Sequence, residues 1–394
     1  MKRIASSLIL LSVSLLAVAQ KLDWNVRFDY LLRNYEYDRS HNVYDDSYTI
    51  HAARLTPEIG LLVKQNSNVY HRMRVGIDIL KDMGEGKQNL DLFREMTFYY
   101  NVEAILDNGG RFEAIAGCYP NTFPEGDAIG PYFDDDYVFY NNNLEGVFFK
   151  YRNKRIFAEI ALDWPGMFGD TAHPLRRERF QVMGAGTWNF AGDFNFCWTG
   201  SFYHYSCAPN LPNVVDNHMC NPWFQWEPFC FLDDLRLDLG GIFTCQCDRI
   251  RGMNPKFPMG LYSRQIIGKW GFAIDNYFYY GDDLMPLMDM SYNGVPYEDL
   301  YFGDRGFHTL FDRPSWVDYF HIKYEPELKA CPWLSLSVVF SFHLGEPSKI
   351  LDTPVFRGWQ QGVELKVNLE SLRPHPTGNK SRRGYHSHFV RYSL

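Results

Sequence analysis

The segments that connect the strand-like stretches of this chain are alternately short and long. We count sixteen stretches from Leu22 to Glu370, each about as long as a tilted strand that crosses a bilayer. The long connections are irregular and mostly acidic or rich in proline and glycine, and the short ones are residues 65–68, 107–110, 152–154, 191–192, 233–234 and 268–269. Such sorting is typical of a transmembrane antiparallel up-and-down β-barrel with short periplasmic turns and long extracellular loops.

Within the stretches, apolar and polar residues alternate with a period of two, as in strands with one apolar face. Met73 and Val75 share one face, while Arg72 and Arg74 share the other. An arginine facing lipid at the bilayer midplane would cost roughly 2–4 kcal/mol, so the charged face is expected to line a water-filled interior. The fold prediction is therefore all-β, a single barrel of about 16 strands. Two stretches, 222–231 and 316–325, are poorly patterned, so even counts from about 14 to 18 also fit.

The first residues have the pattern of a secretory signal peptide. Lys2 and Arg3 precede an apolar stretch that ends at the small residues Ala17, Val18 and Ala19. Export through a cleavable signal would take the chain to the cell outer membrane. The predicted organisation is a signal peptide at 1–19, a transmembrane β-barrel at 20–370 and a basic C-terminal tail at 371–394.

Composition excludes some classes of function. Without Lys2 and Arg3, the 39 basic residues fall to 37 against 47 acidic ones, and this net charge of −10 argues against nucleic acid as a partner. Cys245 and Cys247 lie two apart on the apolar face of a strand, where small buried hydrophobes are commoner than metal ligands. Nucleophile-elbow, zinc-protease and phosphate-loop motifs are absent from the sequence. We therefore expect no enzymatic activity, no cofactor and no bound metal.

The third long connection, residues 120–143, is acidic and contains neither lysine nor arginine. Its segment Phe123-Pro124-Glu125-Gly126-Asp127 resembles the Pro-Glu-Phe-Gly-Gly-Asp motif of general diffusion porins, without the aromatic residue and one glycine. In that family the third loop folds into the barrel and forms the acidic side of a constriction. The resemblance implies an acidic pore-lining loop made of Glu125, Asp127, Asp134, Asp135 and Asp136. Clustered carboxylates also suit calcium, although the spacing is not that of an EF-hand.

In the same family, arginines from early strands form the opposite wall of the constriction. The positions that match are Arg27, Arg72, Arg74 and Arg111, predicted to face inward. Opposed acidic and basic walls would create a transverse field that orders dipolar solutes. The alternative is that each arginine simply pairs with a carboxylate in the lumen, such as Asp29, Asp78 or Glu113.

The mature chain also resembles porin-like outer-membrane proteins of the Bacteroidetes type, through its Ala-Val-Ala-Gln signal end and its barrel rich in Tyr, Asp and Asn. This implies passive diffusion of small polar solutes through a charge-lined lumen. The expected partners are outer-membrane lipid, lipopolysaccharide, small polar solutes and a possible homo-oligomer. Two alternatives stay open. One is a secreted or surface β-propeller or sandwich that binds or acts on glycans, and the other is a plugged barrel in polysaccharide export or adhesion.

Overall fold

The computed structural model describes residues 20–37, 47–84, 92–127, 130–250, 252–297, 300–349 and 352–372. The predicted signal peptide at 1–19, and the predicted tail from residue 373 onward, lie outside these residues. Within the described ranges, no helix is both long and apolar enough to cross a membrane.

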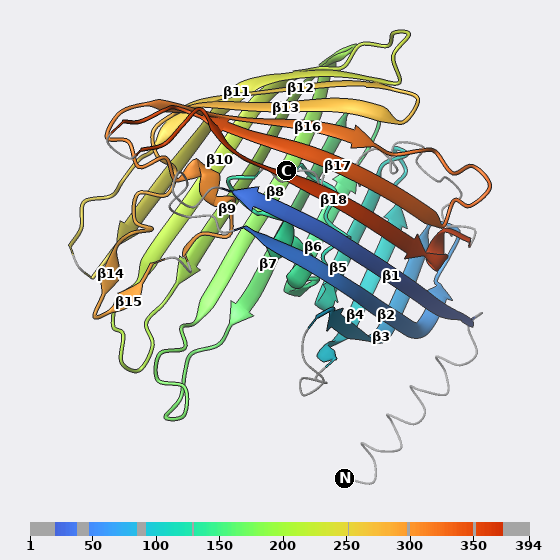
Figure 1. Ribbon diagram of the computed structural model, residues 1–394. Helices are drawn as coiled ribbons and strands as arrows, with labels where there is room; N and C mark the ends of the chain where they lie inside the picture. Colours follow the sequence, from blue (N-terminus) through green and yellow to red (C-terminus); the bar gives the residue numbers. More distant parts are fainter. Residues whose placement is uncertain are drawn as a thin grey trace.

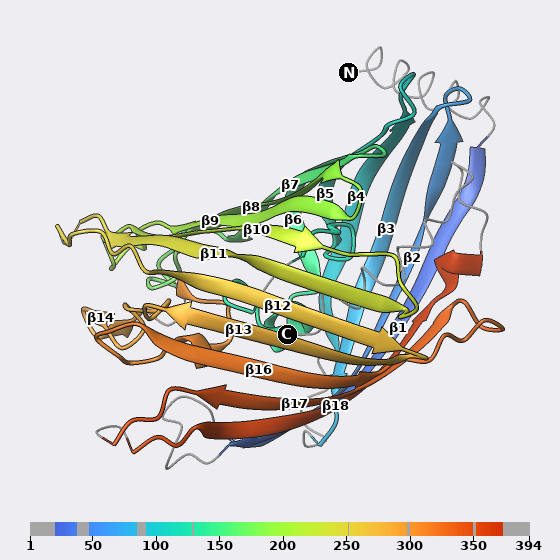
Figure 2. The same ribbon diagram turned by 90° about the horizontal axis from the view of Figure 1, so that it is seen from above.

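Sixteen antiparallel strands close into one barrel (Figures 1 and 2). The first and last strands meet in register from Arg27 opposite Asn368 to Tyr37 opposite Gly358, so the sheet has no open edge there. This confirms the predicted all-β barrel. The barrel strands are β1 (Gln20–Tyr37), β2 (Tyr48–Lys64), β3 (Val69–Asp82), β4 (Phe93–Ile105), β5 (Arg111–Pro120), β6 (Asn143–Arg152), β7 (Ile156–Gly166), β8 (Arg179–Ala191), β9 (Phe194–Tyr205), β10 (Val215–Trp226), β11 (Asp234–Asp248), β12 (Met259–Lys269), β13 (Phe272–Gly281), β16 (Ser315–Tyr324), β17 (Leu334–Gly345) and β18 (Phe356–Asn368).

The remaining elements lie in the connections or after β18. They are the hairpin β14 (Ser291–Tyr292) and β15 (Val295–Pro296), the helix α2 (Asp135–Tyr140) and the 3-10 turns η2 (Arg305–Phe307) and η3 (Leu369–Leu372).

One predicted strand was misplaced. The stretch at 222–231 is in fact β10, Val215–Trp226, and the turn that follows is residues 227–233 rather than 233–234. The first outward-facing residues of β10 are Asp216 and His218, which are polar, so the expected alternation is lost at that end of the strand.

The two faces of the wall differ as the alternation predicted. On β11, Leu239 faces outward and is 61% exposed, whereas the neighbouring Asp238 faces inward and is fully buried. Met73 and Val75 are likewise exposed on the outside of β3, and Arg72 and Arg74 are buried on the inside. The outward apolar side chains form a surface suited to lipid.

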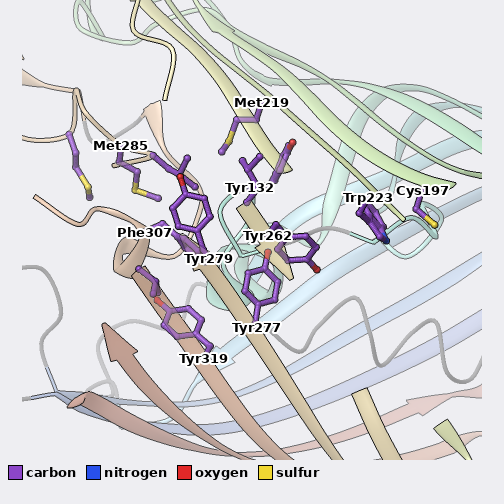
Figure 3. Close-up of a cluster of buried hydrophobic side chains, with 14 residues drawn as sticks. Tyr132, Cys197, Met219, Trp223, Tyr262, Tyr277, Tyr279, Met285, Phe307 and Tyr319 are labelled. Atoms are coloured by element: carbon purple, nitrogen blue, oxygen red, sulfur yellow. The ribbon is translucent and has the colours of Figure 1, made fainter. Parts of the chain in front are cut away.

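Two long connections fold into the barrel instead of extending from it. The first, residues 121–142, carries α2. The second, residues 282–314, is called the inner loop here, and its described part buries Leu284, Met285 and Phe307 completely or almost so. Figure 3 shows Phe307 among the inward-facing tyrosines of β13 and β16, with ring-centroid distances of 5.5–6.1 Å. The inner loop therefore fills part of the lumen with apolar side chains.

The lipid-facing assignment can be tested by measuring how the cost of a charged side chain on the outer face depends on its depth in the bilayer. Leu239→Arg should lower the free energy of unfolding by roughly 2–4 kcal/mol, because the guanidinium would lie near the bilayer midplane. Leu235→Arg, at the periplasmic end of the same face, should cost at most about 1 kcal/mol. Urea unfolding of the protein in lipid bilayers measures both values, and equal costs at the two depths would contradict the assignment.

Candidate functional site

Two arginines of the predicted basic wall are buried in the lumen against carboxylates of the wall itself. Arg74, 2% exposed, donates to Asp23 at 2.6 Å and to Glu370 at 2.8 Å. Arg72 lies 3.0 Å from Asp23 and 3.1 Å from Glu103. These contacts correspond to the pairing alternative, although the carboxylates are not the ones expected.

The other two basic-wall residues are placed differently. Arg27 reaches the inward-folded loop and donates to Thr122 at 3.0 Å and to Asn142 at 3.4 Å. Arg111 begins β5 at the periplasmic turn and lies opposite Arg152 in the sheet register. The four arginines therefore do not form one cluster facing the acidic loop.

A different arginine binds the acidic end of that loop. Asp134 caps α2 by accepting from the backbone N–H of Asp136. Asp135 and Asp136 lie 3.2 and 2.8 Å from Arg33 of β1, which also contacts Glu364 of β18 at 3.1 Å. Asp135 and Asp136 thus hold α2 against the wall through Arg33, a partner that the sequence analysis did not select.

The beginning of the loop is anchored in the same manner. Glu125 forms ion pairs with Lys150, at 2.9 Å, and with Arg152, at 2.5 Å. Asp127 lies 2.6 Å from Arg236 of β11. The five predicted acidic residues all lie in the inward-folded segment, and their role in solute selection remains a prediction.

His308 secures the inner loop through two carboxylates. Its Nδ1 lies 2.7 Å from Asp283 and its Nε2 lies 3.1 Å from Asp289. Burial lowers the pKa of the His308 imidazole, but hydrogen bonds and charge from Asp283 and Asp289 outweigh burial and raise it above the usual value. The protonated ring therefore stabilises the folded loop.

This histidine predicts a pH dependence. Since the folded-state pKa is raised, the stabilisation is complete below the unfolded value of about 6.5 and is lost as pH rises through the folded value. Hydrogen-exchange protection factors of the inner loop should therefore fall as the pH rises above about 6.5. His308→Gln should flatten this dependence. An unchanged pH dependence in that variant would assign the effect to another group.

A second group of polar side chains lies on the outward face, at the extracellular ends of β9, β10 and β11. Asp216 and His218 alternate with Val215 and Asn217, which are buried on the inward face. The strand pairing places Asp216 between His204 of β9 and Cys247 of β11. We call the set His204, Asp216, His218, Cys247 and Arg249 the rim cluster.

Asp216 is the centre of the rim cluster. Its carboxylate lies 2.8 Å from His204 Nδ1, accepts from Arg249 at 2.5 and 2.7 Å, and accepts from the Cys247 thiol at 3.5 Å. His218 Nε2 is 3.9 Å away. Although Asp216 faces outward, it is only 3% exposed because these partners cover it.

Aromatic rings frame the cluster at the height expected of an interfacial girdle. The ring centroids of Phe180 and His204 are 5.1 Å apart, as are those of Phe202 and His218. Trp164 stacks on Phe180 at 5.7 Å. The surroundings are therefore those of a membrane interface, apolar on one side and open to extracellular loops on the other.

The arrangement of His204 has a chemical consequence. A carboxylate at Nδ1 orients an imidazole and favours the tautomer with its proton on Nδ1, which leaves Nε2 able to accept a proton. Ser206 follows two residues later, directly after the last residue of β9, and its hydroxyl donates to the Cys207 thiol sulfur at 3.8 Å. The carboxylate and the imidazole are therefore in direct contact on the outer surface, and a serine lies two residues along the chain from the imidazole.

The sequence analysis missed the rim cluster because its members come from three strands. Cys245 and Cys247 were assigned to an apolar face, which they do share with Leu239. The available signal was the run of polar residues where apolar alternation was expected on β10.

Elsewhere in the described chain, Glu95, Cys118 and Glu145 bring their ligand atoms within 4.8 Å of one another. The expectation of no metal remains a prediction.

Comparison with known proteins finds one family model that matches part of the chain and several solved outer-membrane proteins that resemble it. A family model described as "Lipid A 3'-O-deacylase-type" matches residues 16–198, less than half of the chain. The chain matches no curated protein. Among solved structures, it is similar to Salmonella typhi OmpF in complex with daunomycin, with 10% identity, coverage of 89% of this chain and 98% of that one, and a TM-score of 0.47.

Two further solved structures give similar values. The trimer form of Vibrio cholerae OmpT has 9% identity, covers 89% of this chain and 99% of its own length, and has a TM-score of 0.48. OccAB1 of Acinetobacter baumannii has 11% identity, coverage of 88% and 96%, and a TM-score of 0.49.

The family match corrects one prediction. The expectation of no enzymatic activity is wrong, because the matching model describes an enzyme family. The expectation relied on short motifs, and a site assembled across neighbouring strands leaves no such motif.

The fold and location do agree with the sequence analysis. With a closed barrel of sixteen strands, an apolar outer face and a charged inner face, the chain has the architecture of an outer-membrane β-barrel protein.

Proposed function

We propose that this protein hydrolyses an ester-linked acyl chain of a lipid A-type glycolipid in the outer leaflet of the outer membrane. The observation that carries the proposal is the His204 imidazole, held by a buried carboxylate on the lipid-facing rim of the barrel. The match to a deacylase-type family supports the choice of reaction. A site on the outer surface suits a substrate that is itself a membrane lipid.

The proposed reaction needs only side chains of this region. Ser206 Oγ attacks the ester carbonyl while His204 Nε2 takes the hydroxyl proton. The ester C–O bond then breaks, and the imidazolium donates that proton to the departing sugar oxygen. A water molecule, deprotonated by His204, attacks the acyl-serine carbonyl. The imidazolium then returns this proton to Ser206 Oγ as the fatty acid leaves. Asp216 stabilises the imidazolium throughout, and Arg249, with its side chain 56% exposed, offers a cation to the anionic headgroup.

The test is acyl release from lipid A by the refolded protein in vesicles, followed by mass spectrometry of the free fatty acid. His204→Asn and Ser206→Ala should each reduce the rate by about 10²- to 10⁴-fold, because each removes a member of the proton-transfer chain. His51→Asn is the matched control, since His51 also faces outward near the extracellular end of its strand but pairs with Tyr30. Wild-type rates in His204→Asn would refute the proposed site.

A second candidate is passive diffusion of small polar solutes through the lumen, alone or as a homo-oligomer. Inward-facing charges such as Arg33 and Arg74 favour it, since they suit an aqueous interior. The inner loop and the described part of residues 121–142 oppose it, because they occupy the lumen, and α2 also binds Arg33 through Asp135 and Asp136.

Single-channel conductance in a planar bilayer separates the two candidates. Because of the inner loop, we expect the wild-type protein to show little conductance, and a variant lacking residues 285–306 to show discrete steps. Long-lived open steps in the wild-type protein would instead establish an open channel.

A further inference from the structure

We propose that the inner loop positions the rim cluster from the opposite side of the barrel wall, with Tyr297 and Asn217 as positioning residues. This inference rests on the proposed function. It assigns a role in catalysis to a segment that would otherwise be only a plug. Its basis is that each outward-facing member of the cluster has an inward-facing neighbour bound to, or packed against, the loop or the wall behind it.

On β10, the inward-facing residue between Asp216 and His218 is Asn217, which is 6% exposed. Its side-chain amide donates to the backbone carbonyl oxygen of Leu300 in the inner loop at 3.0 Å. Leu300 itself is fully buried. One hydrogen bond therefore ties the peptide units on both sides of Asn217 to the loop, and those units carry the central carboxylate and one imidazole of the cluster.

On β11, the inward-facing residues on either side of Cys247 are Gln246 and Asp248, both fully buried. The Gln246 amide donates to the Leu284 carbonyl oxygen at 2.8 Å. The Tyr297 hydroxyl donates to the Asp248 carboxylate, which also accepts from Asn213 at 3.0 Å. The loop thus holds the backbone on both sides of the thiol.

Asp248 directly precedes Arg249, the cation that holds Asp216. The Tyr297 hydroxyl therefore holds the residue that directly precedes this arginine.

On β9, the residues flanking His204 are fastened in the same manner. Tyr203 packs edge-on against Phe302 of the inner loop, with ring centroids 4.6 Å apart. Tyr205 lies under the Arg177 guanidinium at 4.5 Å, and Arg177 donates to the Ser206 carbonyl oxygen at 3.1 Å. All three strands that form the cluster are therefore fixed from inside.

Such fixing is needed because of where the cluster lies. Its residues are within three positions of the strand ends, where the ladder of backbone hydrogen bonds stops and the strands are least constrained. Catalytic geometry has to be held within about 0.5 Å, and a misplacement of about 1 Å can cost about 100-fold in rate. Successive side chains point to opposite faces, so holding the inward one also holds its outward neighbours.

The experiment uses the full-length protein and conservative variants. Tyr297→Phe keeps the ring and removes the hydroxyl, and Asn217→Leu removes the bond to Leu300. Each should lower kcat about 10- to 100-fold. KM should be nearly unchanged in Asn217→Leu, which does not alter the contacts of Asp248 beside Arg249. Tyr319→Phe is the matched control, since it also removes a hydroxyl bonded to an inner-loop aspartate, Asp304, but away from the cluster.

A second readout does not depend on turnover. Nuclear magnetic resonance of ring-labelled histidine reports the tautomer and the titration midpoint of His204, assigned by comparison with His204→Asn. Tyr297→Phe and Asn217→Leu should each shift that midpoint, and Tyr319→Phe should not. Unchanged kcat and an unchanged His204 titration in both variants would overturn the positioning role. If the wild-type protein releases no acyl chain while the titration still shifts, the hydrolase proposal fails and the positioning inference survives.

Discussion

The hydrocarbon of a bilayer offers no hydrogen-bond partners, so every backbone N–H and C=O group of a membrane-spanning strand has to be satisfied by another strand. The pairing of β1 with β18 meets this requirement by removing the last open edge. The other features of the fold follow from closure. A closed sheet of sixteen strands has two faces, one toward lipid and one toward a wide lumen, and alternating side chains supply both. The lumen is wide enough to receive two long connections.

Much of this architecture could be predicted from sequence, because it depends on periodicity. Leu239 and Asp238, or Met73 and Arg74, reveal their faces by position alone. Prediction failed at β10, where Asp216 and His218 replace apolar residues on the outer face. Local sequence propensity could not reveal why Asp216 is polar. The reason is its contact with His204 of β9 and with Arg249, which follows β11. The strand was hardest to recognise where it carries the candidate site.

The ion-pair partners of the charged residues also could not be predicted from the sequence. The acidic loop was expected to oppose Arg72 and Arg74, yet those arginines bind Asp23 and Glu370, while Arg33 binds the loop. Which arginine meets which carboxylate depends on strand tilt and on the path of a loop through the lumen, and neither is encoded in spacing. The same holds for the rim cluster, whose Asp216 and Cys247 are brought together only by register.

Closure between β1 and β18 also has a consequence for biogenesis. The paired residues Arg27 and Asn368 are separated by nearly the whole barrel sequence, so this contact forms only after all the intervening strands are in place. Until then the edge of β1 exposes unpaired backbone groups that could template association with another chain. A cell that makes this protein has to shield that edge from export until the last strand arrives, and the time needed to add sixteen strands sets how long the shielding must last.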